Sequence, residues 1–455
     1  MTGLLEAGHA SGPIPMVLLG GSMIGIYVLI ATGKLHKLTA ALLGGIVCTA
    51  LGLVLGVLHD YGVVHKILAK DLNVLGVIVG TSILVDISGR SGLFQFLAIK
   101  IAKKAKGDPA RLFTALMGLT VLFVSVLTIA PGTLIVVSLA LVLARTLDLN
   151  PAPYLIGVAV VANSGALVTF ASGICTLMVG SAAGIPYVHF LQVSLPAALF
   201  TAVVAWWVIG RRYRGSLTAG ETTPDERRTR IESFDEYAMI TDRRVFRRCA
   251  WILGVTIAGF ALAQPLGVGL DFVAIAGGAA ALFLSGHDPE EAVKKVNWTV
   301  ILFFVGLFVM IGVVEETGLL QLLASGMASL SGGNVQIALV LLIVFTAVTS
   351  GIMDNIPVAA TLIPIVKSMI GTGLAAEPLW WGLIISANLG GNGTPIGSIS
   401  CVIALHALTD ATGRKVSWGE YLRAGGLTLA LQVLLVIAYL LTMTVFDLFP
   451  TLPTP

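Results

Sequence analysis

Two polar segments interrupt the apolar sequence in the second half of this chain. Residues 351–357 read GIMDNIP and residues 386–395 read SANLGGNGTP, so both combine polar side chains with helix-breaking glycine or proline. Irregular backbone inside a bilayer has to be buried in protein or line a cavity. A charged side chain at that depth costs about 3 kcal/mol or more, which makes a functional role the first interpretation. The two segments therefore predict a solute-binding site near the middle of a membrane.

The carboxylate of Asp354 and the polar groups around the breaks are the candidates for ion and solute binding. We expect Asp354 to exchange a proton or a cation as its burial changes with conformation. Glycines let the backbone unwind toward a ligand, and amides supply both donors and acceptors. The alternative is structural, because the same side chains can satisfy backbone groups that the breaks release. The expected solute-binding residues are Asn355, Asn388, Gly391, Asn392, Gly393 and Thr394, with Asn163, Thr169 and Ser172 as their first-half counterparts.

The charge of these segments bears on the kind of solute. No lysine, arginine or histidine lies within either break. Amides and hydroxyls with one carboxylate favour a neutral or cationic solute over a multivalent anion.

Two threonines and two cysteines are secondary candidates, namely Thr128, Thr133, Cys175 and Cys401. Each cysteine follows a break, and two thiols could ligate a thiophilic solute such as trivalent arsenic, although cysteine is also a common small buried residue. The four cysteines of the chain form neither a disulfide framework nor a zinc pattern, and no Walker A or HExxH motif is present. We therefore expect no metal, no cofactor, no nucleic-acid partner and no enzymatic activity.

The rest of the chain has the composition of a polytopic membrane protein. Of its 455 residues, 56% are hydrophobic and 11% are charged, whereas soluble domains carry about 25% charged residues. Two apolar segments, 111–146 and 336–370, are too long for one crossing and are broken near Ala130-Pro131-Gly132 and Asp354 to Pro357, which predicts re-entrant helical hairpins. The predicted spans run over 15–33, 39–58, 73–89, 152–180, 188–210, 249–265, 269–286, 298–315, 379–406 and 422–446.

An internal repeat relates the two halves. Residues 71–97 parallel 297–323, Pro131 matches Pro357, and Asn163 matches Asn388. The number of crossings between the two starts is odd, which inverts the second unit, and such repeats place the site at their interface. We predict an all-α polytopic membrane protein with two inverted-topology repeats, each with a re-entrant hairpin and a broken transmembrane helix.

The expected organisation is two halves joined by a basic linker. The first half, 1–210, holds scaffold helices in 15–89, hairpin 111–146, broken helix 152–180 and helix 188–210. The second half, 249–455, holds scaffold helices in 249–315, hairpin 336–370, broken helix 379–406 and helix 422–446. The linker, 211–248, contains ten arginines and no lysine, and basic loops favour the cytoplasmic side. We therefore predict a multi-pass protein of the cytoplasmic (inner) membrane, with a cytoplasmic linker and both termini outside.

The second-half motifs resemble a known group of transporters. Residues 354–361 (DNIPVAAT), followed by Pro364, are similar to the second-hairpin signature of ArsB/NhaD-type permeases, the arsenite-efflux and sodium–proton antiporter branch of the ion transporter superfamily. Residues 386–397 (SANLGGNGTPIG) are similar to that branch's second broken helix. The resemblance implies a transport domain that moves as an elevator against a scaffold. It also implies that Asp354, Asn355, Asn388, Asn392 and Thr394 face the solute.

Departures from the branch's pattern bear on the substrate. Thr128-Ile129 stands where the branch commonly carries an Asp-Asn pair, so one hairpin carboxylate is left and two-carboxylate sodium–proton exchange is less favoured. We expect proton-coupled efflux of arsenite or antimonite by alternating access. A sodium–proton antiporter, a sodium-coupled transporter of di- or tricarboxylates or another anion, and an intramembrane enzyme or channel stay as alternatives. Many relatives are dimers, so a homodimer in the lipid bilayer is left open, as is a soluble ATPase subunit.

Overall fold

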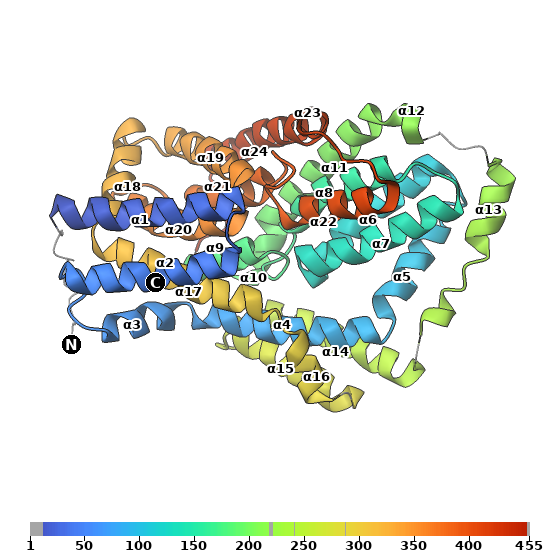
Figure 1. Ribbon diagram of the computed structural model, residues 1–455, viewed down its shortest axis with the longest axis horizontal. Coiled ribbons are helices and arrows are strands. Elements are labelled where there is room, and N and C mark those ends of the chain that lie inside the picture. Colours follow the sequence, from blue (N-terminus) through green and yellow to red (C-terminus); the bar gives the residue numbers. More distant parts are fainter. Residues whose placement is uncertain (1–11, 218–221, 241, 287, 453–455) are drawn as a thin grey trace.

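Helices and the turns between them make up the described part of the chain, with no strand in it (Figure 1). The computed structural model describes residues 12–217, 222–240, 242–286 and 288–452, so the two termini predicted to lie outside fall beyond the described residues. Among these residues ten helices are long and apolar enough to cross a bilayer, which confirms an all-α polytopic membrane protein. They are α1 (Pro13–Thr32), α2 (Lys37–Val54), α4 (Leu72–Arg90), α6 (Pro109–Leu127), α7 (Ile129–Thr146), the helix Tyr187–Arg212 that contains α11 (Leu195–Arg212), α14 (Arg243–Leu262), α17 (Trp298–Glu316), α19 (Val335–Ile352) and the helix Trp418–Val445 that contains α24 (Leu427–Val445).

Both re-entrant hairpins are present. Hairpin 1 consists of α6 and α7, and hairpin 2 consists of α19 and α20 (Asn355–Gly371). The first break lies at Thr128, with φ 71° and ψ 170°, and not at the expected Ala130-Pro131-Gly132. Proline fits the first turn of a helix because the N–H it lacks would have no helical partner there. Pro131 therefore helps to start α7, as Pro357 helps to start α20.

Both broken helices are present as well, and their second parts are exchanged between the repeats. The first consists of α8 (Pro151–Gly165) and α9 (Ile174–Ala182), and the second of α21 (Ala376–Gly390) and α22 (Ile399–Thr412). In Figure 1, α9 lies beside α20 and α21, whereas α22 lies beside α7 and α8. Each break is consequently surrounded by elements of both halves.

Pairs of scaffold helices recur with their partners exchanged, which is the mark of the inverted repeat. α2 packs along α17, and α15 (Leu270–Ser285) packs along α4. A glycine makes the close approach in both pairs: Gly306 faces the backbone of Ala41, and Gly80 faces the backbone of Ala274. Small residues of this kind let membrane helices approach closely.

Local backbone features recur in both halves too. Gly92 and Gly318 precede α5 (Leu93–Lys103) and α18 (Leu319–Leu330) with φ of 81° and 82°. A five-residue π-helical turn begins the last long helix of each half, at Phe190–Ser194 and at Leu422–Gly426. The sequence repeat is therefore a structural repeat.

The described part of the linker lies against the first half. Its helix α13 (Pro224–Glu232) begins with a capping box of Thr223 and Glu226. Arg230 donates to the carbonyl of Thr146 at 3.0 Å, and Lys103 forms an ion pair with Glu236 at 2.7 Å. These contacts hold the linker at the end of the molecule where α7 ends.

Candidate functional site

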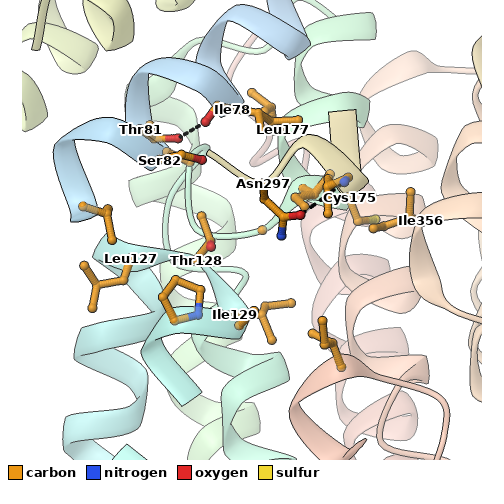
Figure 2. Close-up of a pocket in the computed structure, with 18 of the residues that line it drawn as sticks. Ile78, Thr81, Ser82, Leu127, Thr128, Ile129, Cys175, Leu177, Asn297 and Ile356 are labelled. Atoms are coloured by element: carbon orange, nitrogen blue, oxygen red, sulfur yellow. Dashed lines mark hydrogen bonds between the residues drawn. The ribbon is translucent and has the colours of Figure 1, made fainter. Parts of the chain in front are cut away.

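A cavity of about 320 Å³ lies where the two hairpin tips meet the scaffold. Figure 2 shows Leu127, Thr128 and Ile129 of hairpin 1 on one side and Ile356 of hairpin 2 on the other. The starts of α2, α9, α17 and α22, the end of α16 (Pro289–Lys295) and residues 77–86 of α4 complete the wall. The polar and charged side chains around it are Lys37, Thr81, Ser82, Asp86, Thr128, Lys295, Asn297, Asp354 and Asn355.

Four helices of the hairpins and broken helices start at this cavity. Their first residues, which all line it, are Ile129 of α7, Ile174 of α9, Asn355 of α20 and Ile399 of α22. A helix N-terminus leaves backbone N–H groups free and carries a partial charge equivalent to about +0.5. Each of the four ends adds a positive contribution to the potential in the cavity, and such ends bind anions.

Asp354 is paired with a lysine of the scaffold. Its carboxylate accepts from the Lys37 Nζ at 3.3 Å and from the Ile356 N–H at 3.4 Å, so it also caps α20. The two paired side chains are 30% and 21% exposed, which leaves both within reach of the cavity. A second lysine, Lys295, lies on the same wall.

Sequence reasoning missed both lysines. It considered cationic side chains only within the two breaks, where none is present. Lys37 is 317 residues from Asp354 in the chain, so only the fold brings the two together. The available signal was a lysine directly at the start of an apolar span, where its side chain can reach a buried acceptor.

Four of the residues expected at the site line the cavity: Asp354, Asn355, Thr128 and Cys175. Thr133 is buried within α7. Cys401 is also buried, and its sulfur lies 2.9 Å from the Tyr421 hydroxyl. The cavity wall therefore carries the thiol of Cys175 without that of Cys401.

Several expected residues form a buried hydrogen-bond network between the two broken helices. The Asn163 amide donates to Asn392 at 2.8 Å and accepts from the Ser398 hydroxyl at 2.8 Å. Asn392 in turn donates to Gln432 at 2.9 Å, and Gln432 donates to the Thr201 carbonyl at 2.8 Å. This network joins both breaks to α11 and α24.

The remaining expected residues also bind protein groups. Asn388 donates to Thr176 at 3.0 Å and to the Ile384 carbonyl at 2.8 Å, while its buried amide oxygen has no partner among the described residues. Backbone carbonyls accept from Thr394, Thr169 and Ser172. Gly391 and Gly393 are close-packed, with added Cβ atoms at 2.8 Å from Ser398 and 3.0 Å from Leu429. These residues hold the breaks in shape, and direct solute contact by them stays a prediction.

The network is expected to contribute measurably to stability. Replacing Asn392 with leucine leaves the Asn163 Nδ2 donor and the Gln432 Oε1 acceptor without partners, and each buried unsatisfied group costs about 1–3 kcal/mol. We expect the midpoint of thermal unfolding in detergent to fall clearly, while Gln336→Leu at the exposed start of α19 leaves it nearly unchanged. A Gln432→Leu change should then cost less in the Asn392→Leu background than in the original protein. Equal midpoints for Asn392→Leu and Gln336→Leu would contradict this account.

The helices, hairpins and central cavity define a membrane transporter. The model of the citrate transporter family, CitMHS, matches residues 27–386. The chain belongs to this family of the ion transporter superfamily.

Similar proteins agree with this assignment. A protein of Mycobacterium bovis called an uncharacterized transporter is 29% identical over 92% of this chain and 96% of its own length. One of Synechocystis with the same description is 25% identical, again over 92% and 96%. The crystal structure of the YdaH transporter of Alcanivorax borkumensis, described as having an unusual topology, matches with a TM-score of 0.59 and 17% identity over 97% of this chain and 100% of that one. The superfamily expected from the motifs is thereby confirmed, while membership of the arsenite-efflux branch stays a prediction.

Proposed function

We propose that the protein is a secondary active transporter of a small multivalent anion, with di- and tricarboxylates as the substrate class. The observation that carries this proposal is the convergence of four helix N-termini on one cavity, where two lysines, Lys37 and Lys295, balance the carboxylates of Asp86 and Asp354. Carboxylates are bound well by free backbone N–H groups and by ammonium groups. The description of the family as citrate transporters supports the same class.

Asp354 is the coupling residue in this proposal. Lys37 neutralises it in the present conformation. When the hairpin moves away from α2, a proton or a sodium ion takes the place of the ammonium group, because a carboxylate buried without a cation is unstable. The free amide oxygen of Asn388 is a hard ligand of the type that sodium binds, and it offers a second place for the coupling ion.

A second cavity supports alternating access. It measures about 260 Å³. Four helices that line the first cavity, α4, α9, α17 and α20, also line this one with their opposite ends. Lys70, Glu315 and Lys367 lie on its wall. The proposed motion carries the hairpins and broken helices along the scaffold, so that the substrate site passes from the first cavity to the second. In the predicted orientation the first cavity faces the cytoplasm.

Among the described residues, few polar contacts join the hairpins and broken helices to the scaffold helices. A sliding motion requires such a weakly bonded interface. The Tyr27 hydroxyl lies 2.6 Å from that of Thr361, and Asn73 donates to Ser181. The Lys37–Asp354 pair is the third such contact. Apolar contacts fill much of the remaining interface, and these allow displacement without leaving polar groups unpaired.

The proposal is tested in proteoliposomes with citrate, succinate and arsenite as alternative solutes. We expect citrate or succinate to accumulate when a sodium or a proton gradient is imposed, and Asp354→Asn to abolish the dependence on that gradient. Arsenite efflux is the second candidate, because the Cys175 thiol lies on the cavity wall. Movement of arsenite under a pH gradient, with no movement of either carboxylate, would sink the carboxylate proposal.

A further inference from the structure

A separate polar cavity of about 400 Å³ lies near the ends of three membrane helices. It is bounded by the start of α8, the end of α11 and the start of the helix Trp418–Val445. Three arginines line it, Arg212, Arg414 and Arg423, and we call this cavity the arginine pocket. No residue of its wall belongs to the central cavity.

The arginine pocket carries an excess of positive charge. Its one carboxylate, Glu420, accepts from Arg414 at 2.8 Å and from the Tyr213 hydroxyl at 3.5 Å. In the part of the chain that the structure describes, Arg212 and Arg423 form no ion pair. Three arginines against one carboxylate leave two formal positive charges, so the pocket favours an anion.

Two helix N-termini add to this charge. Asn150 caps α8 through the Ala152 N–H at 3.0 Å, and Ser417 caps the helix Trp418–Val445 through the Glu420 N–H at 3.2 Å. All four of these residues line the pocket. Hydroxyl and amide donors around a doubly charged cavity match the oxygens of a phosphate group.

Two of the three arginines have no basic counterpart in the other repeat. When the two halves are aligned on their π-helical turns, Leu191 corresponds to Arg423 and Thr444 corresponds to Arg212. The N-cap of α21 that corresponds to Asn150 is Ala375. Equivalent positions of the other repeat thus build the same helices without Arg212 and Arg423, so helix formation at these positions does not depend on arginine.

Tryptophans place the arginine pocket at the depth of the lipid headgroups. Trp207 and Trp418 are 52% and 55% exposed, and the Arg211 guanidinium lies over the Trp207 ring at 5.8 Å from its centre. Exposed tryptophans at helix ends mark the membrane–water boundary. Basic pockets between membrane helices at this level bind anionic headgroups.

We propose that the arginine pocket binds a phosphate group, and that its source is the headgroup of an anionic phospholipid. Arginine forms bidentate hydrogen bonds with phosphate oxygens, so Arg212 and Arg423 supply the main contacts. Arg414 is held toward the pocket by Glu420. The site is independent of the transported solute and of the coupling ion.

The test compares lipid retention by the full chain in native mass spectrometry after purification in mild detergent. Phosphatidylglycerol and phosphatidylcholine are offered in equal amounts. We expect the original protein to retain phosphatidylglycerol preferentially, and Arg212→Gln/Arg423→Gln to lose that preference about tenfold. Arg243→Gln/Arg247→Gln, which removes two basic residues at the boundary end of α14, is the matched control and should keep it.

Two further measurements separate the alternatives. Arg212→Lys/Arg423→Lys keeps the charge without the bidentate geometry, so it should retain the lipid at an intermediate level. This result would show that the loss of lipid from the Gln variant is not caused by misfolding. Equal retention by the Gln variant and the original protein overturns the site. If inorganic phosphate raises the unfolding midpoint of delipidated protein as much as phosphatidylglycerol does, and the Gln variant shows neither effect, the phosphate chemistry stands and the lipid source is overturned.

Discussion

Replacing Lys37 with methionine is expected to weaken the binding of an anionic substrate about tenfold. The change removes a positive charge from the cavity wall and leaves the Asp354 carboxylate, formerly 3.3 Å from the ammonium, to repel the substrate. The ion pair is partly exposed. The free energy lost when it is broken should therefore lie between the roughly 0.2–1 kcal/mol of surface pairs and the roughly 3–5 kcal/mol of buried pairs. A factor of ten corresponds to about 1.4 kcal/mol, which falls in that interval. The measurement is the concentration dependence of carboxylate uptake into proteoliposomes.

Lys34→Met is the matched control for this change. Lys34 lies three residues before Lys37 in the chain but does not line the cavity, so its removal should leave the concentration dependence unchanged. The double variant Lys37→Met/Asp354→Asn then shows whether Lys37 binds the substrate or only neutralises Asp354. If Lys37 serves only to neutralise Asp354, the double variant recovers the affinity of the original protein. If it also attracts the substrate, the affinity stays low. Unchanged affinity in Lys37→Met alone would contradict a role of this lysine at the site.

The hairpins and broken helices could be predicted from sequence because their signals are local. A glycine, proline or asparagine inside an apolar run is visible without knowledge of the fold, and matching breakers in both halves revealed the repeat. The position of the first break was off by a few residues because Pro131 looks the same whether it ends one helix or starts the next.

The direction in which the polar side chains point could not be predicted in the same way. Asn163 and Asn388 follow the sequence repeat, yet each reaches a partner in the other half, Ser398 and Thr176 respectively. These pairs exist because α9 and α22 are exchanged between the repeats, and exchange is a property of the whole fold. The charge of the cavity was missed for the same reason, since its lysines come from distant scaffold segments.

The repeat also predicts that Gly80 and Gly306, which occupy equivalent positions in the two halves, are both needed for close helix packing. A Cβ added to Gly306 would lie 2.5 Å from the carbonyl carbon and oxygen of Ala41, and one added to Gly80 would lie 2.3 Å from the carbonyl carbon of Ala274. In both cases the atoms that the added Cβ would meet belong to the backbone of the neighbouring helix. An alanine at either position would therefore force the two helices apart. Overpacking of a core costs about 1–3 kcal/mol, and we expect at least the upper value here because no side chain can rotate away.

Gly306→Ala and Gly80→Ala should therefore both lower the midpoint of thermal unfolding in detergent, and by similar amounts. Gly254→Ala in α14 is the matched control, because nothing lies within 4 Å of its added Cβ. In a helix interior alanine is favoured over glycine by about 1 kcal/mol, so the same substitution there should leave the midpoint unchanged or raise it. The opposite signs separate close packing from helix propensity. A common sign for all three variants, or tolerance of alanine at only one of the two matched positions, would show that the two halves do not share this contact.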